Sequence, residues 1–136
     1  MSTTRIVTCI VCPEGCKVSV SMEGDTITGV SGHGCRRGLA YARQEAVAPM
    51  RTLTTSVRVS GGVLPLVSVK TSAPVPRERL HDIMACVRTC CVSAPVRQGE
   101  VVLANVLELG VDVVATRSVE RGSPAAVPEL RHREQQ

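Results

Sequence analysis

Alternating apolar and polar residues predict that the chain begins with a β-hairpin and a short helix. Apolar positions alternate with polar ones over residues 18–22 and again over 26–30, as expected for strands with one buried face. Glu23-Gly24-Asp25 lies between them and is typical of a turn. Residues 5–12 are predicted to form a preceding strand, and residues 36–45 a short helix that ends before the next proline.

The middle of the chain predicts a second hairpin and one more helix. Residues 54–59 and 63–70 flank Gly61-Gly62, a dipeptide typical of hairpin turns, and Pro65 in the second segment indicates an edge strand or a bulge. The helix is expected at about residues 76–91. Its predicted apolar face consists of Leu80, Ile83, Met84, Val87 and Cys91.

Two further apolar segments, residues 101–106 and 110–115, complete the expected strands, after which the periodicity disappears. We therefore expect an α+β fold in three parts. A small β-rich lobe with a hairpin and a short helix occupies residues 1–50, a β-rich lobe with one helix occupies 51–116, and a flexible basic tail occupies 117–136.

The composition limits how the core can be built and which partners fit. The 136 residues include no Phe or Trp and one Tyr, so the core must consist of Val, Leu, Ile and Ala. A bound metal centre would stabilise such a core. The formal net charge is +4, but without aromatic platforms for stacking bases this charge does not indicate nucleic-acid binding.

The number of cysteines and the N-terminal sequence together indicate the cellular compartment of the protein. The chain has seven cysteines, its first residues lack the apolar segment of a signal peptide, and no apolar stretch approaches membrane-spanning length. We expect a cytoplasmic protein without an integral membrane segment. In a reducing cytoplasm, clustered cysteines are more often metal ligands than disulfides.

Four of the cysteines form the candidate site. Cys9, Cys12 and Cys16 are closely spaced as C-x-x-C-x-x-x-C, and Cys35 follows later. Structural zinc sites usually use two short ligand pairs, whereas here the count is three plus one. Three closely spaced thiolates can each bind a different iron of a cubane, and a distant fourth completes it. The spacing favours a [4Fe–4S] cluster held by these four cysteines.

Other interpretations of this segment remain open. Cys9 and Cys12 with His33 and Cys35 would make a two-pair Zn²⁺ site that leaves Cys16 unused. Cys9 and Cys12 could instead form a disulfide or act as a redox C-x-x-C pair. His33 lies between two glycines, which favours a loop residue over a ligand.

The remaining three cysteines occur at the end of the predicted second helix. Cys86 and Cys90 are one turn apart and could bind a metal as a pair, but no further ligand accompanies them. We expect them, with Cys91, to be small core or boundary residues outside the site.

The chain resembles a bacterial and archaeal family of small C-x-x-C proteins classified as a domain of unknown function. The resemblance covers residues 5–116 and implies a small redox subunit, because the family's genes typically lie beside those of an FAD-dependent glycerol-3-phosphate dehydrogenase and an NAD(FAD)-type oxidoreductase. The matching motifs are Cys9-x-x-Cys12-Pro-x-Gly-Cys16, Gly-x-Gly-Cys35-x-Arg37-Gly38-x-x-Tyr41-Ala-x-Gln44-Glu45, Leu53-Thr-Thr, Gly61-Gly62, Val69-Lys70-Thr71, Ala94-Pro95-Val96 and Val113-Val114-Ala115-Thr116. The chain departs from the family at residues 107–110, where Leu-Glu-Leu-Gly replaces a common Gly-Thr-Gly turn.

A second, partial resemblance covers residues 5–45. The cysteine spacing, with a basic residue and a glycine after the last cysteine, is similar to the N-terminal [4Fe–4S] lobe of molybdopterin oxidoreductases, in which a lysine at the place of Arg37 lies between cluster and pterin. Nothing else of the pterin-binding machinery is present, so only the cluster-ligand roles carry over.

These features lead to one preferred functional hypothesis. We expect an iron–sulfur electron-transfer subunit that catalyses nothing alone and relays electrons from a partner's flavin through the cluster. The first alternative is a zinc-stabilised scaffold that docks the same flavoprotein subunits without a redox role. A third hypothesis is a thiol redox protein that uses Cys9 and Cys12.

Overall fold

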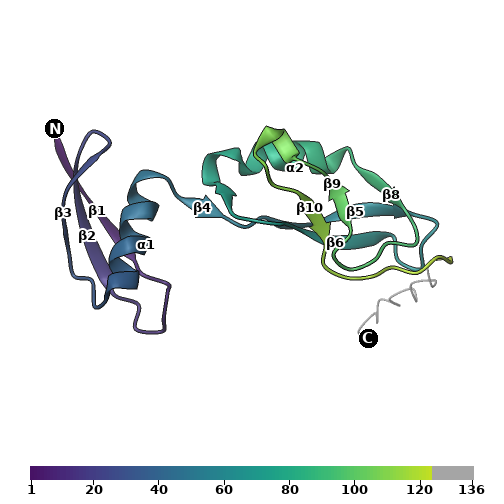
Figure 1. The fold of residues 1–136 in the computed structure, drawn as a ribbon, viewed down its shortest axis with the longest axis horizontal. Helices are drawn as coiled ribbons and strands as arrows, with labels where there is room; N and C mark the ends of the chain where they lie inside the picture. The colour runs from purple at the N-terminus through teal and green to yellow at the C-terminus, as the bar shows by residue number, and fades with distance from the viewer. Residues whose placement is uncertain (124–136) are drawn as a thin grey trace, which may run out of the picture. The chain divides into compact units, whose positions relative to one another are not determined.

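A computed structural model describes residues 1–123, which divide into two compact units (Figure 1). The first unit contains Met1–Arg51 and Pro74–Leu80, and the second contains Thr52–Ala73 and the described residues from His81 onward. The predicted α+β class and the arrangement as two β-rich lobes are confirmed. The chain leaves the first unit after Arg51 and returns to it at Pro74–Leu80, a return that no sequence pattern predicted.

The first unit is built on a three-stranded antiparallel sheet of β1 (Ser2–Thr8), β2 (Lys17–Glu23) and β3 (Thr26–Ser31), in the order β1-β2-β3. The predicted hairpin is present, and Glu23 pairs with Thr26 beside its turn. The first strand begins and ends earlier than the predicted residues 5–12. The cysteine segment therefore leaves the strand and forms a loop.

Helix α1 (Arg36–Val47) packs against one face of this sheet and encloses the core of the first unit. Val18 and Val20 on β2 are 0% exposed, and Ala42 on the helix is also 0% exposed. The small alanine side chains let the helix lie close to the strand, which is how a core without large aromatic residues reaches close packing. Cys9, Met22 and Ala46 complete the buried cluster.

The second unit contains a five-stranded sheet in the order β8-β5-β6-β10-β9. All neighbouring strands are antiparallel except β5 and β8, which are parallel. Pro65 precedes β6, and β6 pairs on both sides, so the edge-strand or bulge prediction for the segment containing Pro65 was wrong. The strands span Thr54–Ser60 (β5), Leu66–Thr71 (β6), Cys91–Ser93 (β8), Val101–Leu103 (β9) and Val113–Ala115 (β10).

The second helix is shorter than the predicted residues 76–91. After β4 (Met50–Arg51) pairs with β7 (Val75–Pro76), a 3-10 turn at Arg77–Arg79 leads into α2 (Leu80–Arg88). Ile83 and Val87 on α2 are buried as expected. No helix within residues 1–123 is both long and apolar enough to cross a membrane.

Two predictions about the ends of these elements need correction. Cys91 does not belong to the apolar face of the helix, because it begins β8 and is exposed. The predicted tail was to begin at residue 117, but Val119 is 1% exposed and pairs with Val96. The rest of that predicted tail, residues 124–136, lies outside the described residues.

The loop between β9 and β10 holds non-glycine residues in the left-handed region of backbone conformation. Leu107 has φ 50° and Glu108 has φ 57°. This conformation costs an L-residue about 1–2 kcal/mol but costs glycine almost nothing. The loop lies where the resembled family commonly has a glycine-containing turn.

We expect Glu108→Gly to raise the free energy of unfolding by up to about 1 kcal/mol, because glycine relieves this strain while adding freedom to the unfolded chain. Urea denaturation would measure the change. Glu120→Gly is the matched control, since Glu120 is also exposed and has no positive φ. A loss of stability in Glu108→Gly equal to that of the control would contradict the strain argument.

Candidate functional site

All four predicted cysteine ligands line one pocket in the first unit. The pocket has a volume of about 210 Å³, and Cys9, Cys12, Cys16 and Cys35 contribute to its wall. The structure therefore brings the distant Cys35 to the three closely spaced cysteines. The other lining residues are Val11, Glu14, Gly34, Arg37 and Gly38.

The sheet explains why segments far apart in sequence meet at this pocket. β1 and β2 stay paired up to Thr8 and Lys17, so the loop of residues 9–16 leaves and returns at the same end of the sheet. The Cys9 N–H donates to the Cys16 carbonyl at 2.8 Å and closes the base of this loop. Because β3 is antiparallel to β2, its last residue, Ser31, brings the chain back to that end.

Cys35 lies directly before helix α1 as its N-terminal cap residue, in an extended conformation with φ −157°. The backbone N–H groups of Gly38 and Arg37 lower the pKa of the Cys35 thiol below its usual value, with a smaller contribution from the Arg37 side chain. Hydrogen bonding from these N–H groups at the start of the helix favours the thiolate, the charged form of the thiol. A thiolate is the form that binds metal.

The four cysteines differ in exposure, and two glycines lie close to the sulfurs of Cys9 and Cys16. Cys9 is 5% exposed, Cys12 and Cys16 are half-buried, and Cys35 is exposed. A Cβ atom on Gly34 would lie 3.3 Å from Cys16 Sγ, and one on Gly38 would lie 3.5 Å from Cys9 Sγ. A side chain at position 34 would crowd the Cys16 sulfur, whereas one at position 38 would make ordinary van der Waals contact with the Cys9 sulfur.

Four thiols line this pocket, and thiolates bind both iron–sulfur clusters and single Zn²⁺ ions. Among residues 1–123, no three His, Cys, Asp or Glu side chains converge closely enough to hold one metal ion. Tetrahedral zinc needs four ligand atoms about 2.0–2.3 Å from one point. A cubane instead takes one thiolate at each of four irons, so its ligands surround a volume. His33 is exposed and lies beside Gly38, which lines the pocket.

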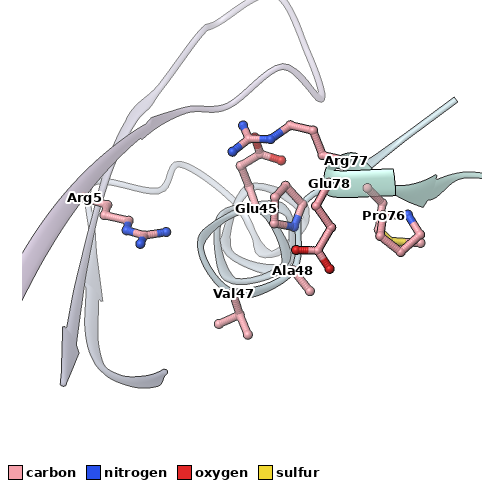
Figure 2. A pocket seen from close by; sticks show the side chains of 9 residues that line it. Arg5, Glu45, Val47, Ala48, Pro76, Arg77 and Glu78 are labelled. Atoms are coloured by element: carbon pink, nitrogen blue, oxygen red, sulfur yellow. The ribbon is translucent and has the colours of Figure 1, made fainter. Parts of the chain in front are cut away.

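A second cavity of about 460 Å³ lies in the first unit at the C-terminal end of α1, the opposite helix end from Cys35. Figure 2 shows the Arg5 guanidinium and the Glu78 carboxylate on different sides of this cavity. Sequence reasoning missed the cavity because its wall comes from three separate segments that share no motif. Its lining residues are Arg5, Glu45, Val47, Ala48, Pro49, Met50, Pro76, Arg77 and Glu78.

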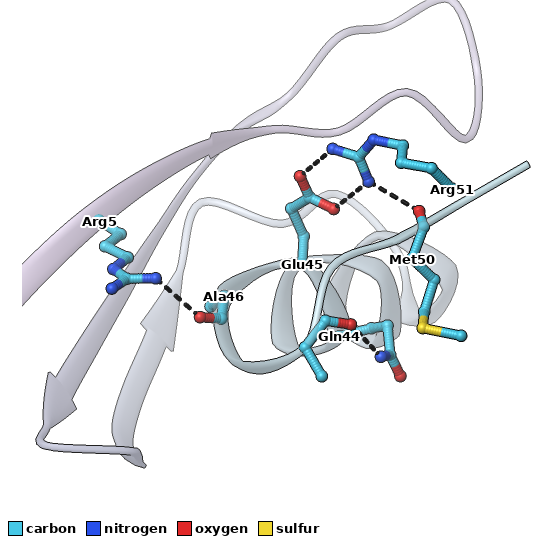
Figure 3. A network of polar contacts seen from close by, with 7 residues as sticks. Arg5, Gln44, Glu45, Ala46, Met50 and Arg51 are labelled. Carbon is cyan, nitrogen blue, oxygen red and sulfur yellow. Dashed lines mark hydrogen bonds and ion pairs between the residues drawn. The ribbon is translucent and has the colours of Figure 1, made fainter. Parts of the chain in front are cut away.

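An ion pair beside this cavity fixes the end of α1 to β4. Arg51 Nη1 donates to Glu45 Oε2 at 2.8 Å, and Arg51 Nη2 pairs with the other carboxylate oxygen (Figure 3). Hydrogen bonds from Arg51 hold the pKa of Glu45 below its usual value, with the charge of Arg77 adding a smaller effect. Glu45 therefore contributes to stability at neutral pH, and that contribution is lost as the pH falls through its lowered pKa.

The other three cysteines belong to the end of α2 and the start of β8 and do not line the four-cysteine pocket. Cys90 Sγ lies 3.4 Å from the Cys86 carbonyl oxygen, the distance of a weak S–H hydrogen bond. Cys86 and Cys90 are half-buried, as predicted for boundary residues.

Comparison with known proteins places the chain in a family. A family model described as protein of unknown function (DUF1667) matches residues 36–117, and the chain belongs to this family. The match covers α1 and most of the second unit but begins just after Cys35. Comparison with curated proteins gives no match.

One solved structure is similar to the chain: the NMR structure of the Clostridium perfringens protein CPE0013. It shares 25% sequence identity, with a TM-score of 0.50, over 61% of this chain and 95% of its own length.

Proposed function

We propose that this protein is an iron–sulfur electron-transfer subunit in which Cys9, Cys12, Cys16 and Cys35 hold one [4Fe–4S] cluster. The observation that carries the proposal is that these four thiols, from a loop and a distant helix start, line a single pocket of about 210 Å³. A cluster bound there would supply one-electron transfer, which no amino-acid side chain of the pocket provides alone.

The residues around the pocket suit this role in distinct ways. Cys9 is buried in the core of the first unit, so the packing around it would hold this ligand in a fixed position. Cys35 is exposed, and the N–H groups at the start of α1 favour its thiolate. Gly34 and Gly38 carry no side chain where the sulfurs of Cys16 and Cys9 come close, and the backbone N–H groups of Arg37 and Gly38 beside Cys35 would tune the reduction potential of a bound cluster.

The proposed partner follows from the resemblance rather than from the geometry. The small C-x-x-C family implies an FAD-dependent dehydrogenase of the glycerol-3-phosphate type and an NAD(FAD)-type oxidoreductase subunit, in the cytoplasm. In such an assembly the cluster would accept electrons from flavin, and this chain would catalyse no reaction alone.

A zinc-stabilised scaffold that docks the same flavoprotein subunits is the second candidate function. It is favoured by one observation: the pocket offers four soft thiol donors, and such donors also bind Zn²⁺. A scaffold would need only the fold that the metal stabilises, without any change of redox state.

Purification without oxygen, followed by iron, sulfide and zinc analysis, tests the proposal. A [4Fe–4S] protein should contain about four irons and four sulfides per chain and absorb broadly near ~400 nm, with bleaching on reduction. A colourless protein with one zinc and no sulfide would replace the electron carrier with the scaffold. Oxygen must be excluded because exposed clusters decay and zinc can take their place.

A further inference from the structure

Two side chains of opposite charge belong to the wall of the four-cysteine pocket. Arg37 and Glu14 line the pocket together with the cysteines, and both are also exposed to solvent. Arg37 lies in the first turn of α1, directly after the Cys35–Arg36 dipeptide, and Glu14 lies in the loop that supplies the other three cysteines. The remaining lining residues are uncharged: Val11, Gly34 and Gly38.

The Arg37 side chain already acts on one of the proposed ligands. The backbone N–H groups of Gly38 and Arg37 are the largest causes of the lowered pKa of the Cys35 thiol, and the Arg37 side chain adds a hydrogen bond and its positive charge. All of these interactions favour negative charge on the sulfur. They therefore also favour negative charge on a metal centre that this sulfur binds.

The other ionisable side chains at this end of the first unit lie outside the pocket wall. Lys17, His33 and Arg36 are exposed and do not line the pocket. Lys17 Nζ donates to Thr8 Oγ1 at 2.8 Å, which holds the ammonium group at the end of the sheet. Arg37 and Glu14 are thus the charges that the wall itself presents to a bound group.

We propose that Arg37 and Glu14 set the reduction potential of the proposed [4Fe–4S] cluster in opposite directions, with Arg37 raising it and Glu14 lowering it. The inference rests on the proposed function and adds how the site is tuned. The four thiolates carry more negative charge than the core carries positive charge, so the ligated cluster is an anion. Gain of one electron from the partner's flavin makes it more negative.

The sign of each effect follows from that extra negative charge. A cation in the pocket wall stabilises the reduced state more than the oxidised state, and a carboxylate does the reverse. Both side chains are exposed, so water and salt weaken the two effects without changing their signs. Because the charges are opposite, the potential of the wild type should lie between those of the two single variants.

Potentiometric titration of the full chain, purified without oxygen and reduced with dithionite, tests the proposal. We expect Arg37→Gln to lower the equilibrium constant for reduction about 5-fold, which is about 40 mV for a one-electron couple. Glu14→Gln should raise it by about the same factor. Their double variant should return close to the wild type, because opposite electrostatic effects cancel whereas structural damage does not. At about 1 M salt both shifts should shrink by at least half.

Three further variants separate the pocket wall from general surface charge. Arg36→Gln removes the same charge from the neighbouring exposed residue and should shift the potential less than half as far. Glu23→Gln removes an exposed carboxylate at the far end of β2 and should leave the potential unchanged. Arg37→Lys keeps the charge and should restore most of the shift. Iron and sulfide content, measured for every variant, separates tuning from loss of the cluster.

The other outcomes each overturn a defined claim. If Arg37→Gln and Glu14→Gln keep the wild-type potential, or Arg36→Gln shifts it as far as Arg37→Gln, tuning by the pocket wall is wrong while the proposed function stands. If Arg37→Gln loses its iron, Glu14→Gln decides: a raised potential supports the proposal and an unchanged one overturns it. If the wild type holds one zinc and no sulfide, the proposed function fails and the tuning falls with it.

Discussion

Cys35→Ser is expected to abolish the metal centre while leaving the fold largely intact. Cys35 is the sole proposed ligand outside residues 9–16, so its loss leaves the fourth corner of the site without a thiolate. A serine hydroxyl is a harder and much less acidic donor and does not replace it. Because Cys35 is exposed, the substitution removes little packing. Iron and sulfide per chain, with absorbance near ~400 nm after anaerobic purification, measure the loss.

Cys86→Ser is the control for this experiment, because Cys86 is a half-buried cysteine that does not line the pocket. We expect it to retain full iron and sulfide. If both variants kept a complete cluster, the ligand assignment would be wrong. If both lost it, the effect would be a general consequence of removing a thiol, and circular dichroism would show whether the fold had changed.

The first hairpin could be predicted because a local pattern determines it. Val18, Val20 and Met22 alternate with polar residues along β2, and burial of one face requires that register. The turn that follows is short and contains Gly24 with φ 60°. The alternating pattern and the turn residues both indicate a hairpin here, so the sequence alone was enough to predict it.

Elements that depend on distant segments could not be predicted in the same way. The pairing of β7 with β4 returns residues 74–80 to the first unit, but two-residue strands carry no periodic signal. Cys91 fitted a helical apolar face, yet it pairs with Arg58 in a parallel strand. Val119 lies in a segment without periodicity and is buried through an isolated bridge to Val96.

For the candidate site, spacing predicted the meeting of the cysteines but not how they are held. The hairpin explains why Cys35 returns towards Cys9, Cys12 and Cys16, as expected for antiparallel strands. The electrostatic effect of the α1 N-terminus on Cys35 depends on the first residue of the helix, a boundary that sequence patterns locate poorly. Proximity of Gly34 and Gly38 to the sulfurs is a tertiary contact, although both glycines belong to the motif around Cys35.

Gly32→Ala is expected to destabilise the first unit and to impair the metal centre. Gly32 has φ +87°, and a Cβ atom there would lie 2.4 Å from the Lys17 carbonyl oxygen, a backbone atom that cannot rotate away. The left-handed conformation costs about 1–2 kcal/mol for alanine, and the clash adds about 1–3 kcal/mol. We expect the free energy of unfolding to fall by about 3 kcal/mol, measured by urea denaturation with a probe of the first unit.

The loss of the metal centre in Gly32→Ala should accompany this destabilisation, because the clash displaces two ligand segments at once. Lys17 follows Cys16, and Gly32 lies on the path from β3 to Cys35, so separating them widens the pocket between those two sulfurs. Gly29→Ala is the matched control, since Gly29 lies in β3 with no atom within 4 Å of an added Cβ. It should be neutral or slightly stabilising and should keep its iron. Equal stability and equal iron content in both variants would mean that the return of the chain at Gly32 does not position Cys35.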